Sequence, residues 1–87
     1  MHEQALNARE FYESRAKTIV KDLREQRQLS YRDLALRLAA IGIRVNERIL
    51  INRINRGSFS FAFALQLLAA MDAESVSVPR LEPSAPR

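Results

Sequence analysis

The sequence predicts an all-α domain of four to five helices, and three observations support this. Apolar residues recur at helical spacing in successive segments, and residues that typically start or stop helices lie between them. No alternation of apolar and polar residues persists, and the only candidate strand, Val76–Val78, is too short and ends at Pro79. With 87 residues, the chain is expected to hold one small domain.

The first helix is predicted from Ala8 to Gln26. Asn7 and Glu10 have the spacing of a capping box, in which each side chain binds a backbone amide of the other residue. Apolar residues four or so apart define the inner face: Tyr12, Ala16, Ile19, Val20 and Leu23.

The second helix is predicted to begin after Ser30, which can cap it together with Asp33. Its core-facing stripe is expected to contain Leu34, Ala35, Leu38 and Ile41. Gly42 is well placed to leave the helix in a left-handed conformation.

The third helix should start near Val45 or Asn46 and stop before Gly57. Its aliphatic residues span a wide arc, and the preferred inner face contains Leu50, Ile51 and Ile54. This choice turns four polar residues outward: Arg48, Asn52, Arg53 and Arg56. Ile49 would then be partly exposed, either to meet a thymine methyl group or to be covered by another chain.

The fourth helix should start at Ser58 or Ser60 and run to about Met71. It is apolar on all sides, and such a helix is normally buried on all sides. A domain this small rarely covers both sides of its last helix, so the surplus apolar surface is a candidate homodimer interface. The residues assigned to it are Phe59, Phe61, Phe63, Leu67 and Met71. The alternative is that the long first helix covers this surface within one chain.

Composition sets the domain limits and excludes several functions. Residues 1–6 are expected to be flexible, residues 7–73 to fold, and residues 74–87, which hold all three prolines, to form a disordered tail. The chain has no cysteine, a single histidine at position 2 and no glycine-rich phosphate loop, so we expect no metal, no cofactor and no enzymatic activity. No apolar run is long enough to span a membrane, which predicts a cytoplasmic protein.

Charge favours a nucleic-acid partner. The net charge is +4, and twelve of the fourteen cations are arginine. Between residues 44 and 56, four arginines stand against the single acid Glu47. Arginine and asparagine make forked contacts to guanine, adenine and phosphate, so a helix that exposes them is typical of a DNA reader.

The order of the predicted helices and turns resembles that of the Cro/CI-type, lambda-repressor-like helix-turn-helix domains. The match runs from about residue 19 to residue 71 and is carried by Ser30, Leu34, Ala35, Ile51, Ile54, Arg56 and Gly57. The course Ser-Tyr-x-x-Leu-Ala…Ile-x-Arg-Gly-x-Phe-Ser is closer still to a group of short bacterial helix-turn-helix-like proteins of unassigned function. The distance from Ala35 to Ile51 exceeds the common pattern by about a turn and a half of helix. We therefore expect an extended second helix that ends at Gly42, followed by a short turn at Ile43 and Arg44.

The resemblance implies a bacterial transcriptional regulator, with a repressor preferred over an activator. It would bind double-stranded DNA as a homodimer, would associate with the nucleoid when bound, and would place the third helix in the major groove. The resemblance also places the start of the second helix against the phosphate backbone. The predicted DNA-binding residues are Tyr31, Arg32, Arg44, Asn46, Arg48, Asn52, Arg53 and Arg56. The alternative function is a protein-interaction module, an adaptor or an antitoxin-like protein, that keeps the helix-turn-helix shape without reading DNA.

Overall fold

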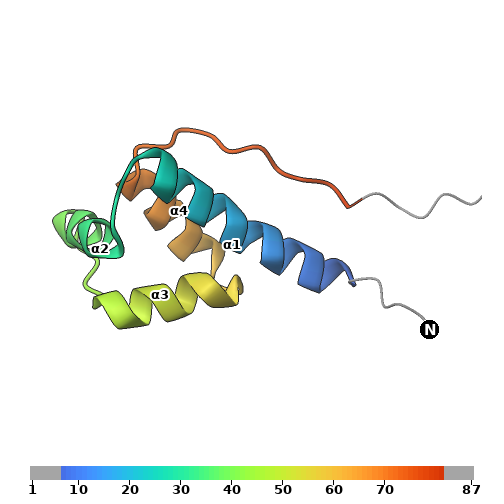
Figure 1. The fold of residues 1–87 in the computed structure, drawn as a ribbon, viewed down its shortest axis with the longest axis horizontal. Coiled ribbons are helices and arrows are strands. Elements are labelled where there is room, and N and C mark those ends of the chain that lie inside the picture. The colour runs from blue at the N-terminus through green and yellow to red at the C-terminus, as the bar shows by residue number, and fades with distance from the viewer. Residues whose placement is uncertain (1–6, 82–87) are drawn as a thin grey trace, which may run out of the picture.

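Four helices form the domain in the computed structural model, which describes residues 7–81 (Figure 1). They are α1 (Ala8–Gln26), α2 (Tyr31–Ala40), α3 (Glu47–Arg56) and α4 (Phe61–Ala70). The described residues contain no strand, which confirms the all-α prediction. None of these helices is both long and apolar enough to cross a membrane. The expected flexible N-terminus, residues 1–6, and the end of the expected tail, residues 82–87, lie outside the described range.

All four helices begin where local side-chain chemistry predicts. The side chains of Asn7, Ser30, Asn46 and Ser60 each accept a hydrogen bond from a backbone N–H of the first turn, at 2.8 to 3.0 Å. These bonds satisfy amides that the helix itself leaves unpaired. The capping boxes predicted for α1 and α2 are both present.

The core lies where α2, α3 and α4 meet the C-terminal half of α1. Helix α1 packs on α3, and α2 packs on both α3 and α4. The buried apolar side chains are Val20, Leu29, Leu34, Leu38, Leu50, Ile54, Phe63, Leu67, Ala70 and Met71. Val20 is the only buried residue of α1, and the N-terminal end of this helix projects beyond the core (Figure 1).

Gly57 joins α3 closely to α1. It ends α3 with a φ of +69°, in the left-handed region, as predicted. A Cβ atom at this position would collide with the backbone of Glu13. Only glycine meets both conditions, so this residue fixes how α3 stands against α1.

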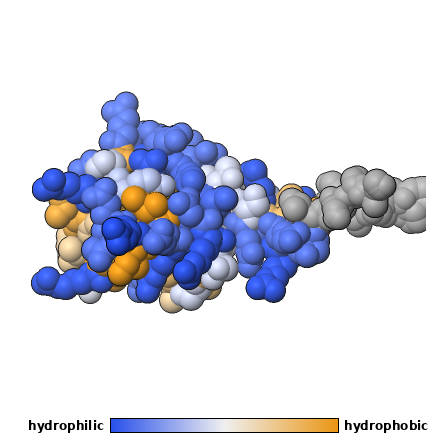
Figure 2. Space-filling model, turned by 60° about the horizontal axis from the view of Figure 1, so that its bottom comes forward, coloured by the Kyte–Doolittle hydropathy of each residue, from blue (hydrophilic) through white to orange (hydrophobic). Residues whose placement is uncertain are grey.

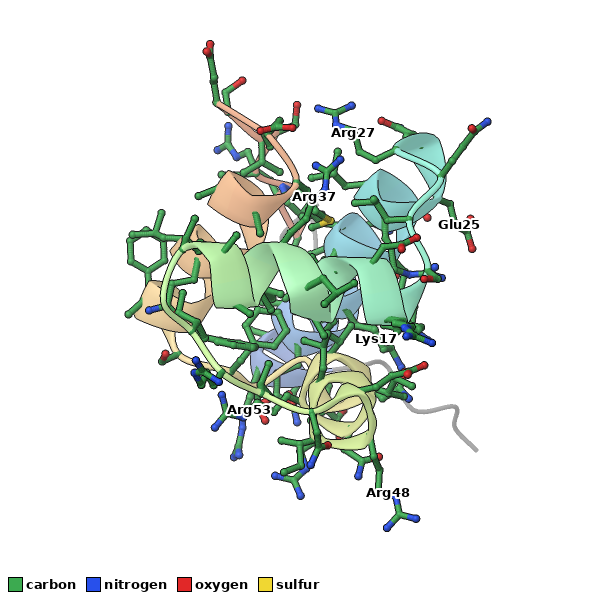
Figure 3. All side chains as sticks on the ribbon, turned by 90° about the vertical axis from the view of Figure 1, so that its left-hand side faces the viewer. Lys17, Glu25, Arg27, Arg37, Arg48 and Arg53 are labelled. Atoms are coloured by element: carbon green, nitrogen blue, oxygen red, sulfur yellow. The ribbon has the colours of Figure 1, made fainter. Side chains whose placement is uncertain are left out.

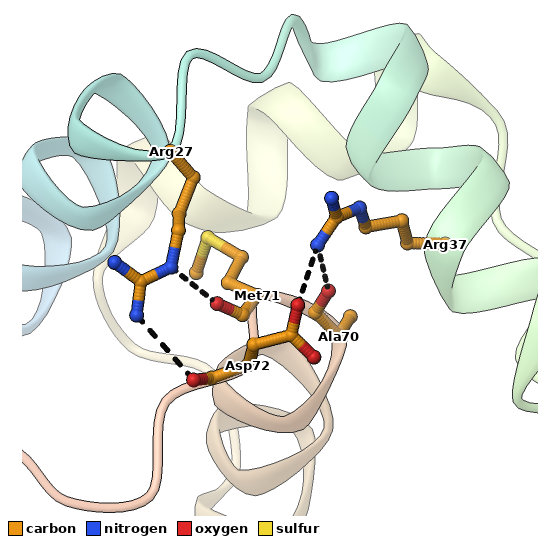
Figure 4. A network of polar contacts seen from close by, with 5 residues as sticks. All are labelled: Arg27, Arg37, Ala70, Met71 and Asp72. Carbon is orange, nitrogen blue, oxygen red and sulfur yellow. Dashed lines mark hydrogen bonds and ion pairs between the residues drawn. The ribbon is translucent and has the colours of Figure 1, made fainter.

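Two arginines hold the C-terminal end of α4 (Figure 4). The Nε of Arg27, just after α1, donates to the Met71 carbonyl at 2.8 Å, and its Nη2 donates to the Asp72 carbonyl at 3.3 Å. Arg37 of α2 donates to the Ala70 carbonyl at 3.2 Å and pairs with the Asp72 carboxylate at 3.1 Å. Cations are favourable at this end of a helix, where free carbonyls carry partial negative charge.

The connection between α2 and α3 corrects the prediction of an extended second helix with a short turn. Helix α2 ends at Ala40, before Gly42, and residues 41–46 form the connection. Gly42 still adopts a positive φ, of +94°. Ile41 caps the helix and is half exposed rather than part of the core stripe. The additional length of this sequence is therefore mostly in the connection, which exceeds the three- to four-residue turn of a typical helix-turn-helix.

The described part of the tail, residues 74–81, has no regular secondary structure. It nevertheless follows a defined path back along α1 (Figure 1). Residues 76–79 lie beside Tyr12, Ala16 and Ile19, and the backbone N–H of Leu81 donates to the Tyr12 hydroxyl at 3.2 Å. Tyr12 is consequently a partly exposed residue that meets the tail, and it does not belong to the buried core.

Candidate nucleic-acid interface

Helix α3 has one buried face and one polar face, as predicted. Leu50 and Ile54, four residues apart, are completely buried, and Ile51 is half-buried beside them. On the other sides, Arg48, Asn52, Arg53 and Arg56 are all exposed. In Figure 3, Arg48 extends away from the body of the domain into solvent.

The arginines of this face are not neutralised by acidic neighbours. Within residues 7–81, the two ion pairs are Arg9–Glu13 and Arg37–Asp72, and neither involves α3. The guanidinium groups of Arg48 and Arg56 therefore remain available to a polyanion.

Arg53 also has a structural role. Its Cζ lies 4.8 Å from the centroid of the Phe63 ring, which is buried in the core. This cation–π contact links α3 to α4 and holds the guanidinium over the end of the core. A substitution of Arg53 would therefore affect stability as well as binding.

A groove of about 720 Å³ lies between α2 and α3. Arg32 from α2, Arg44 from the connection and Arg53 from α3 line it, and all three are exposed. The longer connection brings Arg44 to the same groove as the arginines of the two helices. The predicted phosphate contacts Arg32 and Arg44 are thus gathered with Arg53 on one surface.

Apolar side chains also line this groove, and sequence reasoning did not single out all of them. Leu36 is 61% exposed and Ile49 is 45% exposed, and Val45, which is half-buried, also lines the groove. Figure 2, which brings the α3 side forward, shows apolar patches enclosed by hydrophilic surface. Leu36 could have been identified from its position, because it lies two residues from both buried leucines of α2 and so on the opposite face.

Two predicted contact residues are engaged within the chain. The Asn46 side chain accepts from the Ile49 amide at 2.8 Å as the cap of α3, so its carbonyl oxygen is already used. Tyr31 is half-buried and packs against the core, and the Arg24 guanidinium lies 4.1 Å from its ring centroid. The same Arg24 donates to the Leu29 carbonyl at 2.6 Å, which stabilises the turn before α2.

A second, smaller pocket of about 300 Å³ lies beyond the end of α3. It is lined by Arg53, Arg56, Ser58, Phe59, Ser60 and Phe63. Two guanidinium groups and two hydroxyl groups can bind the oxygens of one anionic group. The α3 face thus continues into this pocket without a charged acid in its lining.

The Asp33 carboxylate has a lower pKa in the folded protein than an ordinary aspartate. The Ser30 backbone N–H donates to it at 3.0 Å, and the Ser30 hydroxyl contributes a further hydrogen bond. These bonds favour the ionised form and lower the pKa of Asp33 below its ordinary value of 3.8, with smaller contributions from Arg32 and Arg37. This carboxylate serves to cap α2.

Comparison with known proteins assigns a family. The model of a domain of unknown function, DUF6471, matches residues 12–76. The chain belongs to the DUF6471 family. No curated protein and no solved structure gives a match. The DUF6471 match includes all of α2, α3 and α4, so the groove and the arginine face lie within the region that defines the family.

The predicted dimer residues of this DUF6471 domain are divided between core and surface. Phe63, Leu67 and Met71 are 5%, 0% and 0% exposed, which corrects their assignment to an interface between chains. They contact the other helices of the same chain because α4 is covered on that side by α2 and the core. Phe59 is half-buried and stacks edge-on against Phe63, with ring centroids 6.0 Å apart. Phe61 remains on the surface at 78% exposure, together with Leu65 at 51%.

Among residues 7–81, no group of three or more histidine, cysteine, aspartate or glutamate side chains is arranged to hold a metal ion.

Proposed function

We propose that this DUF6471 protein binds double-stranded DNA through α3, as a helix-turn-helix transcriptional regulator of the lambda-repressor-like type. The observation that carries the proposal is the outward, unpaired set of arginines on a helix that Leu50 and Ile54 anchor in the core. A helix held in this way can enter a major groove without losing its contacts to the domain.

In this proposal the residues have different roles. Arg48, Asn52 and Arg53 contact base edges, since they lie on the outer face of α3. Arg32, Arg44 and Arg56, at the ends and flanks of that face, bind phosphates. Asn46 and Tyr31 act from within the protein, by capping α3 and by supporting the start of α2.

A homodimer would place two copies of α3 in successive major grooves about one helical turn apart. The exposed pair Phe61 and Leu65, four residues apart on α4, supports an apolar contact between the two copies. The interface is thus smaller than the sequence predicted, and it excludes Phe63, Leu67 and Met71. We propose a repressor, because the domain has little surface left for a polymerase contact.

The salt dependence of binding to a random duplex tests this function. Each phosphate that the protein neutralises releases counterions, so the affinity of a DNA reader falls steeply as salt rises. We expect tight binding at low salt and a linear decrease of log affinity with log salt concentration, measured by fluorescence anisotropy. Absence of binding at low salt would contradict the proposal.

Two observations favour a second candidate function, a protein-interaction module. The connection of residues 41–46 is longer than that of a typical helix-turn-helix, and exposed apolar residues occur on both α2 and α4. Such a module would recruit a protein through Leu36 or Phe61 and would show no counterion release with DNA. The same salt titration separates the two functions.

A further inference from the structure

The groove between α2 and α3 is lined by both cationic and apolar side chains, whereas contact with a phosphate backbone alone would require only the cationic ones. Arg32, Arg44 and Arg53 line it together with one acid, Glu47, so the charge of the lining is positive on balance. Leu36 and Ile49 are exposed in the same groove, at 61% and 45%. Exposed apolar side chains gathered in one place typically mark a contact surface.

Ile49 lies in line with the residues that the proposed function assigns to base edges. It precedes Asn52 by three residues and Arg53 by four, and residues at these spacings are neighbours on one helix face. Any duplex that Asn52 and Arg53 reach with their polar groups therefore also meets the Ile49 side chain. Because Ile49 is 45% exposed, this contact requires no rearrangement of the core.

The major groove offers one apolar group at the edge of a base pair, the C5-methyl group of thymine. The other groups exposed there are hydrogen-bond donors and acceptors, which an isoleucine or leucine would desolvate without compensation. The positive lining fits the charge of the duplex, so the apolar and cationic parts of the groove suit the same partner.

We propose that Ile49, with Leu36 in the same groove, recognises thymine methyl groups, and that the protein thereby selects duplexes with A·T pairs beside the pairs that α3 reads through arginine. This inference rests on the proposed DNA-binding function and adds to it a preference for a particular base.

Uracil substitution tests the inference, because it removes the methyl group and keeps the Watson–Crick pairing. The probes are two duplexes of identical sequence, taken from the most enriched fragments of a random-DNA selection, one made with thymine and one with uracil. The full chain should bind the thymine duplex more tightly by about fourfold for each methyl group buried. In Ile49→Ala the ratio of the two affinities should fall towards one, because the side chain that meets the methyl group is removed.

Ile41→Ala is the matched control, since Ile41 is an isoleucine of comparable exposure, at 50%, and does not line the groove. It should keep the wild-type ratio, whereas Leu36→Ala should reduce it. Circular dichroism melting of each variant shows whether the fold is intact, and little change is expected because these side chains are exposed.

The two proposals fail in different ways. Equal affinity of the wild type for both duplexes, with steep salt dependence retained, would overturn methyl recognition and leave DNA binding standing. A thymine preference that persists unchanged in Ile49→Ala and Leu36→Ala would overturn the assignment to this groove. Failure to bind either duplex at low salt would overturn both proposals.

Discussion

Helices α3 and α4 are similar in construction and opposite in surface chemistry. Each has ten residues, each begins at a side-chain cap, and each contributes residues to the same core. Helix α3 nevertheless exposes three arginines and two asparagines, whereas α4 has no charged residue and exposes Phe61 and Leu65. Caps and apolar spacing therefore establish a helix, while the residues on its exposed face decide which partner it can meet.

The largest effect on stability is expected at Gly57, which lies between α3 and α4 in the chain. Gly57→Ala should lower the free energy of unfolding by about 2–5 kcal/mol, because it combines a left-handed conformation with a collision against the Glu13 backbone. Thermal or urea unfolding measures the change. Gly42→Ala is the control, since Gly42 also has a positive φ but no atom near its missing Cβ, and it should cost only about 1–2 kcal/mol. Equal losses in both variants would show that the close approach to α1 is unimportant.

The next largest effect is expected on DNA affinity, at a residue of α3 that contributes little to stability. Arg48→Ala should weaken DNA binding by about 1–3 kcal/mol and leave the unfolding midpoint nearly unchanged, because Arg48 is exposed and makes no ion pair with residues 7–81. Anisotropy titrations and thermal melts measure the two quantities. Arg15→Ala on α1 removes an exposed arginine that lies beside tail residues 76–79, and it should leave the affinity almost unchanged. A loss of the same size in both variants would indicate that only net charge matters.

A smaller effect is expected on the opposite surface, that of α4. Phe61→Ala should reduce self-association while changing the stability of the monomer by no more than about 0.5 kcal/mol. Sedimentation velocity over a range of protein concentrations measures the association. Val78→Ala is the control because Val78 is almost as exposed, at 76%, but lies on the tail. An unchanged dimer in Phe61→Ala would exclude this face of α4 as the interface.

The smallest effect is the pH dependence of stability, which should differ between the cap of α2 and the cap of α4. The pKa of Asp33 is lowered in the folded state, so the cap stabilises α2 fully above the ordinary value of 3.8 and loses this contribution as pH falls through the lowered pKa. The difference in the free energy of unfolding between the wild type and Asp33→Asn should therefore be constant near neutral pH and shrink in strong acid. Chemical unfolding at a series of pH values measures this difference. Ser60→Ala, which removes the cap of α4, should show no such pH dependence, because the third position of that helix is Phe63.

The fold was predictable to the extent that neighbouring residues determine it. The starts of α1 and α2 follow from Asn7–Glu10 and Ser30–Asp33, whose groups are close in sequence and act within one turn. The orientation of α3 was predictable too, because its polar side chains and most of its apolar ones lie on different faces of the helix.

The parts that sequence reasoning missed depend on contacts between distant segments. An all-round apolar helix does not indicate which side its neighbours cover, so Phe63, Leu67 and Met71 were assigned to an interface although they are buried. The length of the connection of residues 41–46 was likewise not predicted, because it depends on how α2 and α3 pack against each other. The path of the tail along α1 had no apolar period to reveal it.

The arginines that hold the end of α4 have a consequence for how charge is interpreted in this protein. Arg27 and Arg37 donate hydrogen bonds to carbonyls and a carboxylate of their own chain, so part of the overall positive charge serves to hold the fold together. Replacing them with neutral residues would lower the isoelectric point just as Arg48→Ala does, yet it would loosen the last helix instead of weakening a contact with nucleic acid. In a basic domain of this size, some arginines stabilise the fold and others are available to bind a partner. The total charge does not distinguish the two roles.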